Sequence, residues 1–143
     1  ACIAPRDLDK LVLVGSAGLW IHEHPIPDLF ALLPFEFAQL LFHDPVAGAA
    51  MLTGGLDFGD VQAVTDFYIG NAKNMGVAGK ILFPIPNRGL ARRLYRLTAP
   101  TAVLWGKSDK LIPPVNATAW KALLPEARVV LFDEAGHMLP YEQ

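Results

Sequence analysis

Two short apolar runs near the end of the chain, joined by a helix-like segment, most constrain the fold. The runs are "TAVLW" at 101–105 and "RVVLF" at 128–132, and both have the apolar content of strands buried on two faces. Between them, Val115, Ala119 and Leu123 recur close to helical spacing, with prolines at both ends of the segment. This order predicts two parallel strands joined by a right-handed helical crossover, the unit of α/β proteins.

A third apolar run and a differently composed middle complete the expected organisation. "LVLV" at 11–14 predicts another buried strand. The region from about 21 to 97 has several Pro and Gly breaks and no clear buried strand, which favours a helical insertion between strands. Helical stretches are predicted in it at 29–41, 60–75 and 90–97.

Composition limits the classes of function. The 143 residues, 52% of them apolar, suffice for one domain with a core, and the net charge of -2 without a basic block argues against nucleic-acid binding. The most apolar stretch, 29–42, is interrupted by Pro34, Glu36 and Gln39 and is shorter than the roughly 20 residues of a membrane span. The single cysteine, Cys2, fits a reducing compartment, so a cytoplasmic location is expected.

A carboxylate and an imidazole follow two neighbouring predicted strands. Ligands of parallel sheets bind at the carboxyl ends of strands, where Asp109 follows the run at 101–105 and His137 follows the run at 128–132. A hydrogen bond between them would fix the imidazole tautomer and stabilise the imidazolium formed on proton uptake. The alternative interpretations are a turn residue that caps the next helix for Asp109 and a structural histidine for His137. Asp133 is the second candidate carboxylate, and Glu142 is interpreted as an anchor of its loop.

The segments around this pair resemble the α/β-hydrolase fold. "WGKSDKLIPP" is similar to the acid loop of that family, "DEAGHMLPYE" to its histidine loop, and "LVLVGSAGLW" to its strand six and the start of its cap. The resemblance implies a partial α/β-hydrolase core at 1–20 and 98–143 and a helical cap, or lid, at 21–97. It implies that Asp109 orients His137, which acts as general base and then general acid, with no metal or organic cofactor. Ester hydrolysis is favoured, while carbon–carbon bond, epoxide and haloalkane hydrolysis stay open.

Ser16, which lies between two glycines, departs from the nucleophile motif of that family. The motif G-x-S-x-G requires glycine two positions before the serine, where Val14 stands, and its serine precedes strand six. Ser108 within the acid loop and Cys2 before a proline turn do not replace it. The nucleophile is therefore expected upstream of Ala1, in a larger protein whose carboxyl-terminal portion this is. Strand six would then expose an edge and an apolar face, and the chain alone would be inactive.

The remaining candidates concern binding. Leu19 and Trp20, beyond the first strand, and Met138, beside His137, are the predicted contacts to a small apolar substrate. The apolar stretch 29–42 would either line a substrate channel or pack the helical region on itself. An alternative function is a non-catalytic member of the family that binds an apolar ligand or a partner. Two further groups are interpreted as surface. The triplet His22, Glu23 and His24 has the spacing of metal ligands but no convincing third ligand, although His43 and Asp44 follow later, and Arg92, Arg93 and Arg96 suit the end of a helix in solvent.

Overall fold

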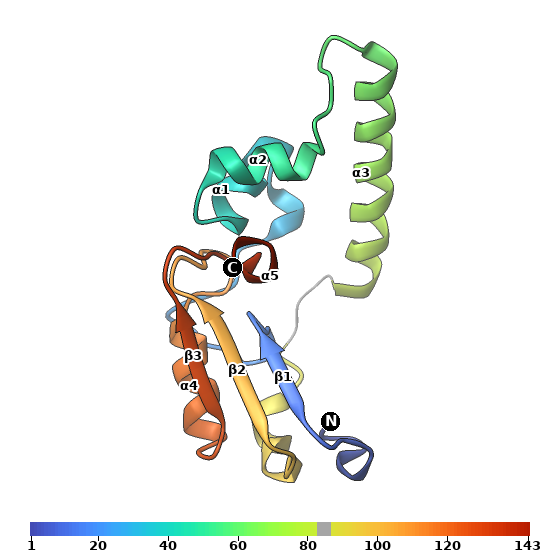
Figure 1. Ribbon diagram of the computed structural model, residues 1–143. Coiled ribbons are helices and arrows are strands. Elements are labelled where there is room, and N and C mark those ends of the chain that lie inside the picture. Colours follow the sequence, from blue (N-terminus) through green and yellow to red (C-terminus); the bar gives the residue numbers. More distant parts are fainter. Residues whose placement is uncertain (83–86) are drawn as a thin grey trace.

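A three-stranded parallel sheet forms the centre of the computed structural model, which describes residues 1–82 and 87–143 (Figure 1). The strands are β1 (Leu11–Val14), β2 (Thr101–Gly106) and β3 (Arg128–Phe132). Their order in the sheet is β1-β2-β3, and Val103 of β2 lies opposite Leu13 on one side and Val129 on the other. The predicted strands, their parallel pairing and the α/β fold class are confirmed.

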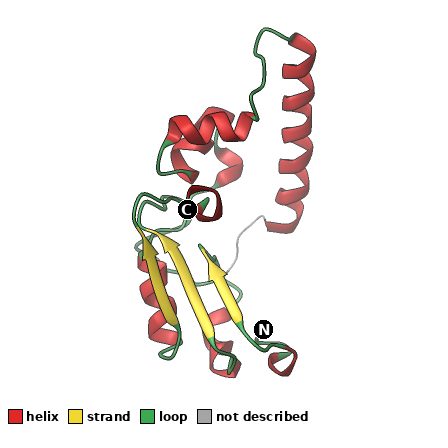
Figure 2. Ribbon diagram, in the orientation of Figure 1, coloured by secondary structure: helices red, strands yellow, loops and turns green. Residues whose placement is uncertain are grey.

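The helices cover one side of the sheet and one end of its strands (Figures 1 and 2). The α-helices are α1 (Phe37–Leu41), α2 (Pro45–Thr53), α3 (Val61–Leu82), α4 (Val115–Leu123) and α5 (Leu139–Glu142). The 3₁₀ helices are η1 (Pro5–Asp7), η2 (Leu29–Ala31), η3 (Pro34–Glu36) and η4 (Leu90–Arg96). Helix α4 is the crossover between β2 and β3, α1 and α2 lie beyond the carboxyl ends of the strands, and α3 stands apart.

The hydrophobic core lies between the sheet and α4. Because strand side chains alternate between the two faces, Val103 and Trp105 point to the same side, where both are fully buried. The indole of Trp105 donates a hydrogen bond to the carbonyl oxygen of Ile112 at 2.8 Å, and Trp120 of α4 belongs to the same cluster. The acid loop that follows β2 is thereby fixed to the core by a satisfied buried hydrogen bond.

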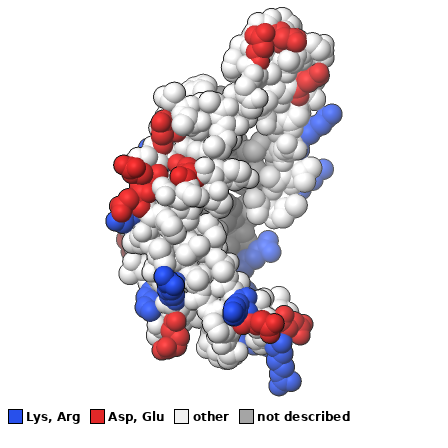
Figure 3. Space-filling view, viewed as in Figure 1, with Lys and Arg blue, Asp and Glu red and all other residues white. Residues whose placement is uncertain are grey.

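The opposite side of β1 is open. Val12 and Val14 alternate with the core-facing residues of this edge strand and are 59% and 36% exposed. Seen from the same side as Figure 1, much of the surface is uncharged (Figure 3). The predicted exposure of an edge and an apolar face is confirmed, and such an edge is a template for pairing with another strand.

The helical region differs from the prediction at four places, one of which is α2 (Pro45–Thr53), a helix that was not predicted. The expected helix over 29–41 is divided into η2, η3 and α1, because a proline disfavours helical geometry in the residue before it and Leu33 is extended, with φ of -78° and ψ of 151°. The helix expected to end near Met75 continues to Leu82, and the last predicted helix is the 3₁₀ helix η4. The proposed cap, 21–97, includes residues 83–86, which lie outside the described residues, and its limits stay a prediction.

The helices also bear on membrane insertion. Within residues 1–82 and 87–143, no helix combines the length and the apolar character that crossing a membrane requires.

Candidate active site

The loops after β2 and β3 are held against each other beneath α1 and α5 (Figure 1). The backbone N–H of Lys107 donates to Phe132 O at 2.8 Å, and that of Ser108 donates to Ala135 O at 2.9 Å. A Cβ atom on Gly106 would lie 2.3 Å from the carbonyl oxygens of both Ala135 and Gly136. The close approach of the two loops therefore requires a residue without a side chain at position 106.

Asp109 and His137 meet where these loops converge. Asp109 Oδ2 lies 3.0 Å from His137 Nδ1, while Oδ1 accepts a hydrogen bond from the Ile112 N–H at 2.8 Å. The Asp109 side chain is fully buried, whereas that of His137 is 22% exposed. Because an ionised carboxylate only accepts hydrogen bonds, this pairing assigns the proton of a neutral imidazole to Nδ1 and leaves the lone pair on Nε2. Asp109 thus also holds the turn of its own loop, but it does not cap α4 as the alternative interpretation had it, because the N-cap residue of α4 is Pro114 and no side chain caps this helix.

The turn after β1 contributes a third backbone segment to this site. Gly15 has a left-handed φ of 49°, and a Cβ atom there would lie 3.2 Å from His137 Nδ1 and 3.4 Å from Asp109 Oδ2. The glycine that follows the "LVLV" strand therefore lets the backbone turn directly against the Asp109–His137 pair. The contact of Gly15 with His137 connects residues 122 positions apart and has no local signal in the sequence.

Replacing Gly15 with alanine should displace the His137 ring as well as strain the backbone. The left-handed conformation alone costs a non-glycine residue about 1–2 kcal/mol. Gly54→Ala is the matched control, because Gly54 has a similar φ of 61° and nothing lies within 4 Å of a Cβ atom added there. Both variants should lose stability in chemical unfolding, Gly15→Ala at least as much as Gly54→Ala, but only Gly15→Ala should shift the ring resonances of His137 in NMR spectra. If the His137 ring resonances were unshifted in Gly15→Ala, as expected for Gly54→Ala, the contact between Gly15 and His137 would be contradicted.

Glu142 holds the histidine loop. Its Oε2 accepts from the Gly136 N–H at 2.7 Å and its Oε1 from the His43 N–H at 2.6 Å, in agreement with its interpretation as a loop anchor. Asp133, the second candidate carboxylate, instead forms an exposed 2.6 Å ion pair with Lys107. Exposed ion pairs of this kind contribute little stability. The Asp133 carboxylate is thus engaged by Lys107 at the surface.

The predicted substrate contacts occupy different environments. Leu19 is 6% exposed and belongs to the core cluster, Trp20 is exposed with its ring 6.4 Å from that of His22, and Met138 is half-buried. Their roles in binding stay predictions. The Ser16 carbonyl oxygen accepts from the Trp120 indole at 3.2 Å, which ties the turn after β1 to α4.

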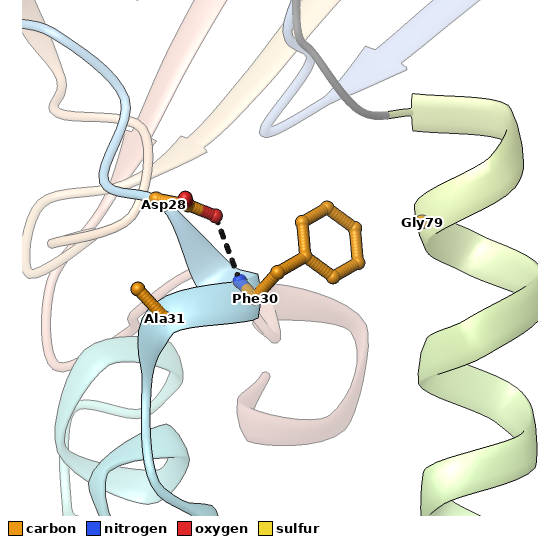
Figure 4. A pocket seen from close by; sticks show the side chains of 4 residues that line it. All are labelled: Asp28, Phe30, Ala31 and Gly79. Carbon is orange, nitrogen blue, oxygen red and sulfur yellow. Dashed lines mark hydrogen bonds between the residues drawn. The ribbon is translucent and has the colours of Figure 1, made fainter.

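The helical region has a separate hollow of about 340 Å³ between η2 and α3 (Figure 4). Asp28 caps η2 by accepting from the Phe30 N–H at 2.9 Å, and the Phe30 ring points toward Gly79 of α3. Phe30 and Ala31 of the apolar stretch 29–42 line this open hollow, which is apart from the Asp109–His137 pair, and the role of the stretch in a substrate channel stays a prediction. Among the residues that the structure describes, no group of three His, Cys, Asp or Glu side chains is arranged to hold a metal ion.

Comparison with known proteins identifies the class of protein to which this fold and site belong. The model of the alpha/beta hydrolase fold family matches residues 51–143, and the chain belongs to this family. It is 28% identical to the 2-hydroxy-6-oxononadienedioate/2-hydroxy-6-oxononatrienedioate hydrolase of Cupriavidus pinatubonensis, over 96% of the chain and 50% of that protein. It is 31% identical to Lipase 3 of a Moraxella species, over 94% of the chain and 44% of that protein.

Solved structures show the same fold. A putative lipase from Acinetobacter baumannii matches with a TM-score of 0.58 at 23% identity, over 99% of this chain and 50% of that one. The 2-hydroxy-6-oxo-6-phenylhexa-2,4-dienoate hydrolase of a Rhodococcus species matches with a TM-score of 0.62 at 19% identity, over 99% of this chain and 53% of that one. The chain thus spans about half the length of the curated relatives it matches.

Proposed function

We propose that this chain supplies the acid and the histidine of a hydrolase catalytic triad. The observation that carries the proposal is the 3.0 Å contact between the buried Asp109 carboxylate and the partly exposed His137 ring. In this role Asp109 fixes the Nδ1–H tautomer and stabilises the imidazolium, and His137 exchanges protons through Nε2. The membership of the family and the hydrolase and lipase names of its relatives support hydrolysis as the reaction class.

The nucleophile belongs, in this proposal, to a segment upstream of Ala1. In the α/β-hydrolase order the nucleophile precedes the acid and the histidine. His137 Nε2 removes the proton from the nucleophile as it attacks the substrate carbonyl carbon, and gives that proton to the leaving group as the scissile bond breaks. Water then repeats the sequence on the acyl-enzyme and releases the acid. The helical region, 21–97, serves as the cap over this site.

Two substrate classes are favoured by specific relatives. Lipase relatives favour an ester with an apolar acyl group. Relatives named for 2-hydroxy-6-oxo dienoates favour hydrolysis of a carbon–carbon bond beside a carbonyl group. Both reactions need the same oriented base, so the Asp109–His137 pair serves either.

The test compares the 143-residue chain with the same chain extended by the upstream part of its gene. Release of p-nitrophenol from p-nitrophenyl butyrate reports ester hydrolysis, and loss of absorbance of 2-hydroxy-6-oxo-6-phenylhexa-2,4-dienoate reports carbon–carbon bond hydrolysis. We expect background rates for the chain alone and turnover of at least one substrate by the extended protein. Ser16→Ala in the extended protein is the control and should keep that turnover.

Two results would contradict the proposal. The first is turnover by the chain alone that is lost in His137→Ala, which would place the nucleophile within these residues. The second is an extended protein that turns over neither substrate and has no nucleophile in its upstream turn, which would favour the non-catalytic binding protein.

A further inference from the structure

His43 contacts both loops that carry the proposed catalytic pair. Its ring Nδ1 lies 2.7 Å from Ser108 Oγ, in the acid loop immediately before Asp109. Its backbone N–H donates to Glu142 Oε1 at 2.6 Å, and the other oxygen of that carboxylate holds the N–H of Gly136, immediately before His137. One residue of the helical region is thus bonded directly to the acid loop and through one carboxylate to the histidine loop.

The chain around His43 is fixed at neighbouring points. The Met138 N–H donates to the carbonyl oxygen of Leu41 at 3.1 Å, so the histidine loop is bonded on both sides of His137. A Cβ atom on Gly136 would lie 2.6 Å from Leu41 O and 2.9 Å from the backbone nitrogen of His43. The end of α1 therefore packs against the histidine loop at backbone contact distance, and the His43 ring extends this attachment to the acid loop.

We propose that His43 is a positioning residue that, through Ser108, keeps Asp109 in register with His137. The inference rests on the proposed function of the Asp109–His137 pair. Asp109 is held within its own loop by the Ile112 N–H, but the place of that loop relative to the histidine loop depends on contacts between them. The His43–Ser108 bond adds an indirect link between the two loops, because His43 lies in a third segment that is attached to the histidine loop.

The readout is the tautomer of His137 in its uncharged form, measured from the ring nitrogen shifts in long-range ¹H–¹⁵N NMR spectra of the 143-residue chain. An Asp109 acceptor at Nδ1 favours the Nδ1–H form. Asp109→Ala should lower the ratio of the Nδ1–H to the Nε2–H form about tenfold, since a hydrogen bond to a charged group is lost. His43→Ala and Ser108→Ala should each lower it about threefold, as expected for an exposed neutral hydrogen bond.

Two further variants separate positioning from general stability. His43→Asn places an amide near the position of Nδ1 and should restore the ratio, because the amide donates and accepts hydrogen bonds. His24→Ala removes another exposed histidine and should leave the ratio unchanged. The double variant His43→Ala/Ser108→Ala should lower the ratio no further than either single change, as expected for two partners of one contact.

The outcomes distinguish the inference from the function on which it rests. The role of His43 is overturned if the ratio of the Nδ1–H to the Nε2–H form is unchanged in Ser108→Ala and in folded His43→Ala but falls in Asp109→Ala. That result would leave the catalytic pair standing. An unchanged ratio in Asp109→Ala overturns the pair itself. Should His43→Ala fail to fold, Ser108→Ala decides, because it removes one hydroxyl group from a half-buried position.

Discussion

Gly106→Ala is expected to destabilise the protein by about 3 kcal/mol or more, as in severely overpacked cores. The added Cβ would lie 2.3 Å from the carbonyl oxygens of Ala135 and Gly136 and 2.7 Å from the carbonyl carbon of Ala135. These are backbone atoms, so the clash is not relieved by rotating a side chain. The two loops must separate, and the contact between Asp109 and His137 must lengthen with them.

Urea unfolding followed by circular dichroism measures this loss. Gly70→Ala is the matched control, since Gly70 lies in α3 with nothing within 4 Å of an added Cβ. Alanine is favoured over glycine inside a helix by about 1 kcal/mol, so the control should be neutral or stabilising. A Gly106→Ala protein as stable as the unaltered chain would mean that the two loops do not approach as closely as described.

Asp109→Asn is expected to lower kcat of the extended, active protein by about 10⁴-fold while KM changes little. The carboxamide can present an N–H to Nδ1, which selects the tautomer with the proton on Nε2 and removes the base. His137→Ala should be at least as severe, because the base itself is then absent. The falls in kcat of Asp109→Asn and His137→Ala both arise in the chemical step, so substrate affinity should be largely retained.

Asp133→Asn is the control for that measurement. Asp133 follows β3 directly and Asp109 lies in the loop after β2, but the Asp133 carboxylate pairs with Lys107 at the surface. We expect less than about a twofold change in kcat, in line with the small contribution of exposed ion pairs. An equal loss in the Asp109 and Asp133 variants, or more than about a tenth of normal kcat in Asp109→Asn, would contradict the assignment of the acid.

The sheet was predictable from the sequence because its signals are local. The runs at 11–14, 101–105 and 128–132 are short, apolar and bounded by turn residues, which is typical of parallel strands buried by a crossover helix. The segment 29–41 was predicted less well. Its apolar content suits a helix, but the restriction that Pro34 places on Leu33 outweighs that preference and divides the segment.

The candidate site was only partly predictable, for a different physical reason. Placing Asp109 and His137 together required only that neighbouring parallel strands end at the same edge of the sheet. The contact of Gly15 with His137 and that of His43 with Ser108 join segments far apart in the chain, and no spacing rule connects them. In the sequence His43 stands out only as a remote metal ligand, and the role proposed for it depends on tertiary packing.

The single crossover between β2 and β3 has a consequence for how a complete site would assemble. Asp109 and His137 are only 28 positions apart in the chain, and the backbone segments described above that contact them all belong to this chain. The contacts described above that restrict rotation of Asp109 and His137 are therefore formed by residues of this chain. In the proposed triad, a nucleophile from an upstream segment would have to be placed against one imidazole nitrogen, so the remaining entropic cost of completing the site is that of ordering this one group.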